Sequence, residues 1–210
     1  MWPRSGIKAF VFRLLLFYGL LLIPWPGLND AYAAVFRGAG NGLFASFGAH
    51  RAVRFKPVSE KPSKWDTDVY LIQRGTSKAW TINHNSRYTG YLPVAALLAL
   101  VFATPVPWSR RWRALLVGLV LVNAFVVLRV AISLVYGFRG LELFIFSPFW
   151  NRTLDLAYEA ISVSVVAIFL VPAVIWILVT VRREDWATLF ETTGKHPPSS
   201  ASASPPPRNG

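Results

Sequence analysis

Long runs of apolar residues alternate along the chain with short basic or polar segments, and this pattern predicts membrane-spanning helices. A helix needs about 20 apolar residues to cross the hydrocarbon core of a bilayer. Four segments approach or exceed that length, at about residues 7–23, 91–106, 112–136 and 154–181. The fourth is longer than one crossing needs, so it is expected to tilt, to kink at Pro172 or to project from the bilayer. The pattern therefore predicts an all-α transmembrane bundle of about four helices.

The basic residues predict how this bundle is oriented. Lysine and arginine gather at the N-terminal segment, in the link "WSRRWR" between the second and third segments, and after the fourth segment at Arg182 and Arg183. Four crossings place all three clusters on one side, which the positive-inside rule identifies as the cytoplasm. The sequence thus predicts a multi-pass protein of the bacterial cytoplasmic (inner) membrane with both termini in the cytoplasm.

The N-terminal segment allows two interpretations. It has the basic start, the short apolar core and the small-residue site (Ala31-Tyr32-Ala33) of a secretory signal peptide. We favour a retained transmembrane anchor over residues 1–25, because the apolar stretch is long for a signal core. Cleavage would leave the orientation of the other helices unchanged.

The region between the first two apolar segments, residues 26–89, is predicted to be an extracytoplasmic loop that contains β structure. "AVRFKPV" is strand-like, and "DVYLIQRGTSKAWTINH" has the pattern of a hairpin, with Val69, Leu71 and Gln73 at alternate positions before a turn at "GTSK". This element is too small to be stable alone, and we expect it to cap a three-helix transmembrane core of residues 90–181. Residues 182–210 form a cytoplasmic tail whose Pro/Ser-rich end is predicted to be disordered.

Composition supports the membrane assignment and excludes several functions. The chain of 210 residues is 54% hydrophobic and 15% charged, unlike an average soluble domain. Its net charge of +12 arises from basic residues around apolar segments, so nucleic-acid binding is not predicted. The chain has no cysteine, which excludes disulfides and a cysteine nucleophile, and its three histidines lack partner ligands at a suitable spacing for a metal. No motif indicates a cofactor.

Polar residues within the apolar segments are the candidate functional residues. Arg129 lies about two turns, or ~12 Å, from the outer end of the third segment, where an arginine costs at least about 2.5–3.5 kcal/mol. Asp155 and Glu159 form an i, i+4 pair at the start of the fourth segment and are expected in the same leaflet, where they can offset this charge. Asn123 lies deeper and on another stripe of the helix, where it can form an interhelical hydrogen bond. A purely architectural pairing, snorkelling of Arg129 to the headgroups and binding of a ligand by Arg129 all stay open.

The stretch "PWSRRWRALLVGLVLVNAFVVLRVAISLVYG" resembles the core of the exosortase/archaeosortase family, multi-pass membrane enzymes that process proteins with C-terminal sorting signals. The resemblance covers about residues 85–180 and matches Arg129 to the family's invariant arginine, although Asn123 stands further from it than in the family pattern. "YTGY" lies where the family has the nucleophilic cysteine of its "CSG" motif, so Tyr88 occupies the position of the nucleophile. The family's catalytic histidine has no counterpart in residues 137–164.

The resemblance implies a degenerate member without catalytic activity, because cysteine catalysis needs a thiolate and a base to activate it. It implies an accessory factor for the sorting or processing of exported proteins, whose partners besides the bilayer are an active exosortase or a sorting-signal helix. Two other hypotheses come from the residues alone. One is a small transporter or channel that uses the Arg/carboxylate cluster, and the other is a membrane enzyme with Asp155 and Glu159 as its acid/base pair.

Overall fold

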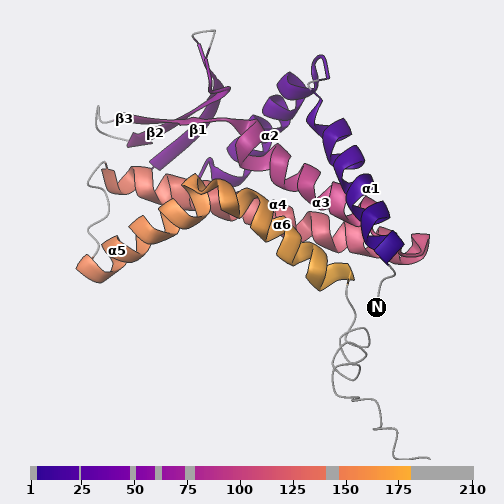
Figure 1. Cartoon of the computed structure of the whole chain (residues 1–210). Helices are drawn as coiled ribbons and strands as arrows, with labels where there is room; N and C mark the ends of the chain where they lie inside the picture. Colours follow the sequence, from indigo (N-terminus) through magenta and orange to yellow (C-terminus); the bar gives the residue numbers. More distant parts are fainter. Residues whose placement is uncertain are drawn as a thin grey trace, which may run out of the picture. The chain divides into compact units, whose positions relative to one another are not determined.

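The computed structural model describes residues 4–23, 25–47, 51–59, 63–73, 79–140 and 147–180, all of which fall within the unit Trp2–Thr180. These residues are mostly helical and include one three-stranded antiparallel sheet (Figure 1). The predicted class, helices with a small β element, is confirmed at this level. The predicted disorder of the tail concerns residues outside those described.

Four helices correspond to the four apolar segments: α1 (Arg4–Leu22), α3 (Leu92–Ala103), α4 (Trp108–Gly140) and α6 (Val165–Thr180). α1 is followed by a turn at Gly27, whose φ of 78° lies in the left-handed region that favours glycine. α3 ends at Thr104, whose extended backbone is the conformation expected before Pro105. α3 packs against α1, α4 and α6, and α6 also packs against α4.

The fourth apolar segment is not a single helix. It forms α5 (Pro148–Ala157) and a π-helical turn, η2 (Tyr158–Val163), before Ser164 takes an extended conformation and α6 begins. α6 is bent by 78° from α5–η2. The break thus lies eight residues before Pro172, which is inside α6. A proline removes one backbone donor, whereas the π turn and the extended Ser164 interrupt the hydrogen-bond ladder itself.

Among the described helices, α4 alone is long and apolar enough to cross a bilayer by itself. The α5–η2 and α6 pair meets the same criterion only when the two bent parts are taken together, and the apolar helix Arg87–Ala103 is shorter. The four crossings, the cytoplasmic termini and the inner-membrane location therefore remain predictions.

The predicted strands are confirmed. β1 (Arg51–Pro57), β2 (Thr67–Gln73) and β3 (Ala79–His84) pair antiparallel in chain order. Val69 of β2 lies opposite Phe55 and Ile82, and the alternation along β2 buries Val69 and Leu71 completely. The expected turn at residues 75–78 lies outside the described residues.

Helix α2 (Leu28–Phe44) has no counterpart among the predicted elements, and it packs on the sheet beside β1. The side-chain amide of Asn41 pairs with the edge strand, donating to the Phe55 carbonyl oxygen at 3.1 Å and accepting from the Phe55 backbone nitrogen at 2.8 Å. Gly40 allows this close approach, because a Cβ there would lie 2.8 Å from the Phe55 ring. α2 thus covers one exposed strand edge with an amide that imitates a neighbouring strand.

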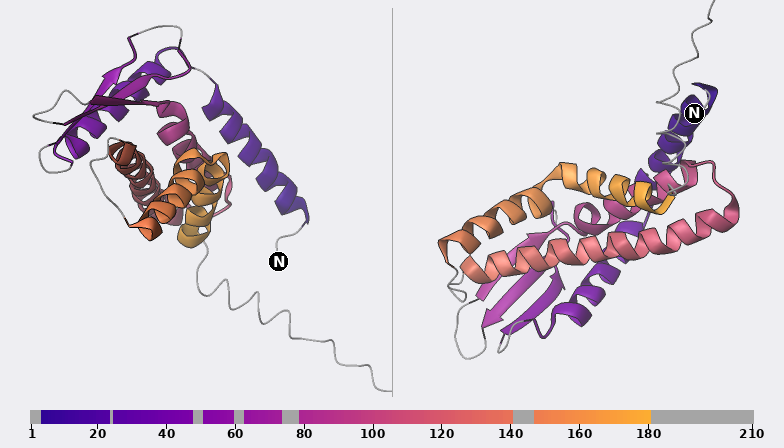
Figure 2. Two further views of the ribbon diagram at one scale, coloured as in Figure 1. Left: turned by 90° about the vertical axis from the view of Figure 1, so that its left-hand side faces the viewer. Right: turned by 90° about the horizontal axis from the view of Figure 1, so that it is seen from below.

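The unit contains two hydrophobic clusters, which pack against different halves of α4. The sheet cluster joins α2 and the strands to the C-terminal half of α4 through Val126, Val130, Leu134 and Phe138. The bundle cluster joins α3 and α6 to the N-terminal half of α4 around Leu97, Val101, Ala114, Leu115, Val122 and Ile175. The sheet and α2 lie on one side of α4, and α5 and α6 on the other (Figure 2). Arg129 belongs to the region of α4 where the two clusters meet.

Candidate functional site: a buried arginine held by backbone carbonyls

Arg129 is buried in the middle of the unit, with 5% of its surface exposed. Its guanidinium binds three backbone carbonyl oxygens from two other segments of the chain. Nη1 donates to the carbonyl oxygens of Tyr88 and Thr89, both at 3.2 Å, and Nη2 donates to that of Ser162 at 2.8 Å. The side chain therefore ties α4 to the start of α3 and to the end of η2.

The acceptors before α3 are free because of the local sequence. They belong to the π-helical turn η1 (Arg87–Tyr91), in which the Leu92 backbone nitrogen donates to the Arg87 carbonyl oxygen. Pro93 has no N–H, so it cannot bond Thr89 as in an α-helix or Tyr88 as in a π-helix. The proline thus removes one helical donor from each of the two carbonyl oxygens that accept from Arg129.

The third acceptor arises from the helix break in the fourth apolar segment. Ser162 lies in the last turn of η2, where a helix leaves its carbonyl oxygens without backbone donors. The negative end of the helix dipole favours a cation at this place. The Ser162 hydroxyl also donates to the Arg129 carbonyl oxygen at 3.2 Å, and the Ser133 hydroxyl donates to the same oxygen at 3.0 Å.

Within the described residues, no carboxylate lies within ion-pair distance of Arg129, since the ion pair found there is between Arg139 and Asp155. The charge is balanced by carbonyl dipoles and by the Phe125 ring, whose centroid lies 5.8 Å from the guanidinium carbon. The Nε of Arg129 is buried and has no hydrogen-bond partner. Low local polarity strengthens the three bonds that are made and makes their loss costly.

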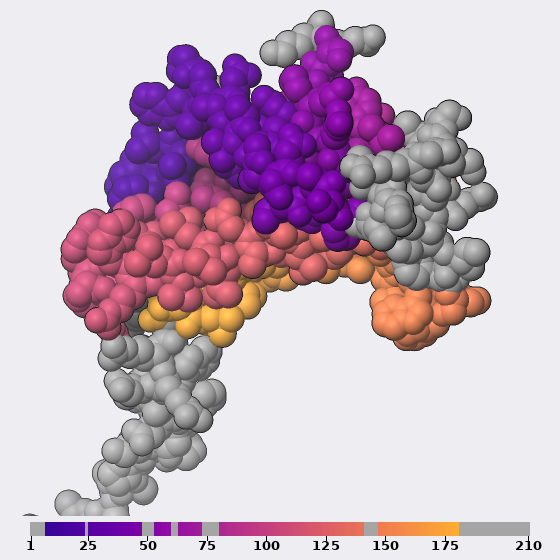
Figure 3. Space-filling view, turned by 180° about the vertical axis from the view of Figure 1, so that it is seen from behind, coloured from indigo at the N-terminus to yellow at the C-terminus, as the bar shows by residue number. Residues whose placement is uncertain are grey.

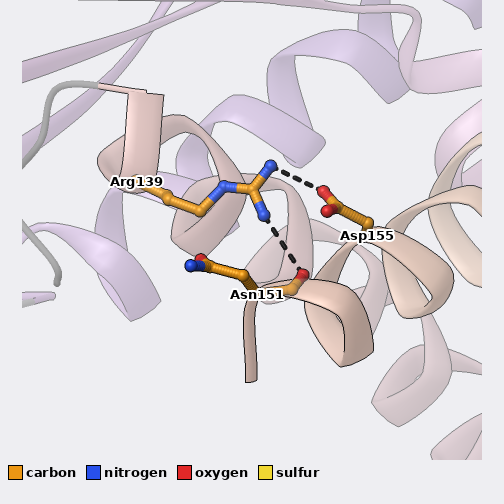
Figure 4. Close-up of polar contacts among 3 residues, drawn as sticks. All are labelled: Arg139, Asn151 and Asp155. Atoms are coloured by element: carbon orange, nitrogen blue, oxygen red, sulfur yellow. Dashed lines mark hydrogen bonds and ion pairs between the residues drawn. The ribbon is translucent and has the colours of Figure 1, made fainter. Parts of the chain in front are cut away.

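The expected pairing of Arg129 with Asp155 or Glu159 is wrong. Asp155 binds Arg139 instead, with 2.6 Å between its Oδ1 and the arginine Nη2, while Arg139 Nη1 donates to the Asn151 carbonyl oxygen at 3.2 Å (Figure 4). Glu159 is exposed. The break at Ser164 explains the difference, because it directs the end of η2, rather than the start of α5, at Arg129.

Asn123 does not join this cluster either. Its side chain is exposed, and its Nδ2 donates to the Leu119 carbonyl oxygen of its own helix at 2.8 Å. The expected interhelical hydrogen bond is therefore not formed, because an asparagine on a helix can satisfy its amide on the preceding turn.

Tyr88 meets Arg129 through its backbone, not through its side chain. Its carbonyl oxygen accepts from Arg129, whereas 55% of the residue is exposed. The next turn is tightly packed, because a Cβ at Gly90 would collide with the Tyr32 hydroxyl. Burial raises the pKa of Tyr32 to about 12, so that hydroxyl stays protonated. The position that resembles the family nucleophile thus lies beside the arginine and presents a carbonyl oxygen to it.

Sequence reasoning did not identify the groups that fix η1 in place. The Asp66 carboxylate accepts from the Ser86 backbone nitrogen and from the Ser86 hydroxyl, the latter at 2.7 Å. The Asn85 side-chain oxygen accepts from the backbone nitrogens of Arg87 and Tyr88 at 3.0 and 3.3 Å. The signal for this cap is an acceptor residue just before a helix, which "HNSRY" contains.

His84, at the end of β3, lies in surroundings that disfavour its charged form. Its Nε2 is buried without a hydrogen-bond partner. Burial, and then the positive charge of Arg129, lower the pKa of His84 from 6.5 to about 4, against a smaller opposing effect of Asp66. The imidazole is therefore neutral at physiological pH.

Asp66 also borders two pockets beside α2, the first of which extends to η1. One, of about 220 Å³, is lined by Tyr32, Trp65, Arg87 and Tyr91 among others, and the second, of about 530 Å³, by Asp30 and Arg37 among others. Over the part of the chain that the structure describes, no cluster of three or more acidic or histidine side chains could hold a metal ion. The comparisons with protein-family models, curated proteins and solved structures found no match.

Proposed function

We propose that this chain is a multi-pass membrane protein that acts as a non-catalytic, exosortase-like accessory factor in the sorting or processing of exported proteins. The observation that carries the proposal is the contact between Arg129 and Tyr88. These two positions match the arginine and the nucleophile of the family, and they meet here although they lie on different helices. The contact is made by a backbone carbonyl oxygen, which supports a structural rather than a catalytic role for Tyr88.

The apolar surface supports the membrane assignment. In the most apolar 18-residue stretch of α4 only 39% is buried, whereas the core helix of a soluble protein is mostly buried. The exposed apolar side chains of α1, α4 and α6 include Phe12, Leu15, Leu16, Val117, Val120, Leu121, Val166, Phe169, Leu170 and Leu178. Apolar surface on this scale is expected to face lipid.

The packing of α1 supports its retention as an anchor. Phe10 stacks on Trp176 of α6, and Phe17 contacts Phe102 of α3. The carbonyl oxygens at the end of α1 accept side-chain hydrogen bonds. Arg87 donates to the Leu22 carbonyl oxygen at 2.8 Å, and the Tyr91 hydroxyl donates to the Leu21 carbonyl oxygen at 2.6 Å. Cleavage after Ala33 would cut inside α2 and remove these contacts.

The two alternative functions have weaker support. The enzyme hypothesis needs Asp155 and Glu159 to act on one substrate, but Asp155 pairs with Arg139 and Glu159 is exposed elsewhere on the helix. The transport hypothesis needs Arg129 to be open to a passing anion, but its donors are bound to backbone carbonyl oxygens or enclosed.

The test is deletion of the gene in its native cell, followed by measurement of the maturation of proteins with C-terminal sorting signals. We expect unprocessed clients to accumulate, and the intact chain to restore processing. Plasmid-borne Tyr88→Phe and Glu159→Gln should restore it as well, since neither phenol nor carboxylate has a chemical role. Normal maturation after deletion would overturn the accessory function. Failure of both variants at normal membrane levels would instead favour an enzyme.

A further inference from the structure

Helix α5 has one face attached to α4 and an opposite face on which three large apolar side chains are exposed. On the attached side, Tyr158 stacks on Tyr136 with ring centroids 4.0 Å apart, and Asp155 binds Arg139. On the other side, Phe149, Trp150 and Leu156 are exposed by 72%, 60% and 60%. These three positions fall within about 120° of the helix circumference, at 100° per residue, so they form one amphipathic face.

The direction of α5 is set by the bend at Ser164. α5–η2 turns 78° away from α6, close to a right angle. If α6 crosses the bilayer, as proposed above, the bend turns α5 away from the direction of this crossing and towards the C-terminal end of α4, which α5 contacts through Asp155. The 16 residues of α6 span about 24 Å, so a bend at its outer end lies near the boundary between acyl chains and headgroups.

The exposed face of α5 is continuous with the surface expected to face lipid. Val163, Val165 and Val166, on either side of the bend, are each about 60% exposed and lead from α5 onto α6. Seen from behind, α5 (orange) projects away from α6 (yellow), with a hollow between them beneath α4 (Figure 3). α5 also carries residue types that favour the membrane interface, with Trp150 on this face and the exposed cation Arg152 at its border.

We propose that α5 is an interfacial helix whose Phe149, Trp150 and Leu156 insert into the outer leaflet at the headgroup–acyl boundary. The partner of this surface is the lipid bilayer, with Arg152 next to the lipid phosphates. α5 thereby fixes the depth of the bend, and with it the height of the Ser162 carbonyl oxygen that Arg129 binds. This inference rests on the proposed membrane crossing of α6.

The absence of cysteine from the chain makes the test direct. Single-cysteine variants of the whole chain are labelled with an environment-sensitive fluorophore and reconstituted into vesicles of phosphatidylcholine and phosphatidylglycerol. Leu156→Cys, with Phe149→Cys as a second variant, reports on α5; Val174→Cys reports on the exposed face of α6, and Arg54→Cys on the sheet. Quenching is compared for lipids spin-labelled near the headgroup, lipids labelled near the acyl end, and iodide in the water.

We expect the α5 probes to be quenched severalfold more by the shallow lipid label than by the deep label or by iodide. The Val174 probe should respond most to the deep label, and the Arg54 probe to iodide. α5 probes quenched by iodide or by the deep label, or protected from all three quenchers by a protein partner, would overturn the interfacial helix while Val174 still reports a crossing. A Val174 probe quenched by iodide would instead overturn the membrane crossing itself.

Discussion

Arg129 and Arg139 lie on the same helix, yet their charges are stabilised in opposite ways. The side chain of Arg139 is 24% exposed and pairs with an Asp155 side chain that is 52% exposed. Arg129 is 5% exposed and binds three backbone carbonyl oxygens. The first arrangement neutralises a charge with a charge where water is near, and the second surrounds a charge with dipoles where water is excluded.

The difference follows from desolvation. An ion pair near water needs little desolvation, and it stabilises the fold by typically less than about 1 kcal/mol. A carboxylate placed beside Arg129 would add a second buried ion, whose desolvation costs several kcal/mol. Carbonyl oxygens left free by a proline and by a helix end already need donors, so binding them to Arg129 satisfies both sides.

Removing the Arg129 guanidinium should have the largest effect. Arg129→Leu removes the donor from three carbonyl oxygens, one buried and two partly buried, so the free energy of unfolding should fall by about 3 kcal/mol. Denaturant titration in mixed micelles measures the loss. Arg129→Lys is the matched control, because its single ammonium keeps the charge but cannot reach both segments with a planar fork, and it should lose less. Stability equal to that of the unchanged protein in Arg129→Leu would contradict the structural role.

The pKa of His84 should report its burial and the nearby charge of Arg129, with an effect of about 3 kcal/mol on the free energy of unfolding. Its pKa of about 4 in the folded protein lies below 6.5, so the unfolded chain binds the proton more tightly. Its contribution is fully present above pH 6.5 and is lost as the pH falls towards 4. The substitution His84→Gln should remove this dependence of the free energy of unfolding on pH.

The pKa of His84 should also distinguish the charge of Arg129 from that of Arg139. Arg129→Gln should raise the pKa of His84, measured by NMR titration of the imidazole, because one of the causes that lower it is removed. Arg139→Gln should leave it unchanged, since Arg139 is not among those causes. An equal shift in both variants would mean that the charge of Arg129 is not felt locally.

The apolar segments and the strands could be predicted because each carries a periodic signal of its own. Residues 112–136 fall inside α4, and the alternation around Val69 identifies β2. The acceptors of Arg129 could not be predicted in the same way, since every residue has a carbonyl oxygen and only the local break makes it available. Pro93 was a usable signal for the first break. Nothing comparable in the sequence marks Ser164, so the sequence does not show that Asp155 pairs with Arg139 or that Glu159 stays exposed.

Breaking the Arg139–Asp155 ion pair should have the smallest effect on stability, so it tests most directly how the two arginines differ. A double-mutant cycle with Arg139→Gln and Asp155→Asn should give a coupling energy of about 0.2–1 kcal/mol, because both side chains are partly exposed. The coupling should shrink further as salt screens the charges, whereas the loss in Arg129→Leu should be almost independent of salt, since its partners are uncharged and buried. The measurement is the same micellar titration at low and high ionic strength. A coupling as large as the loss at Arg129, or a salt-dependent loss at Arg129, would remove the distinction between a surface ion pair and a cation held by backbone dipoles.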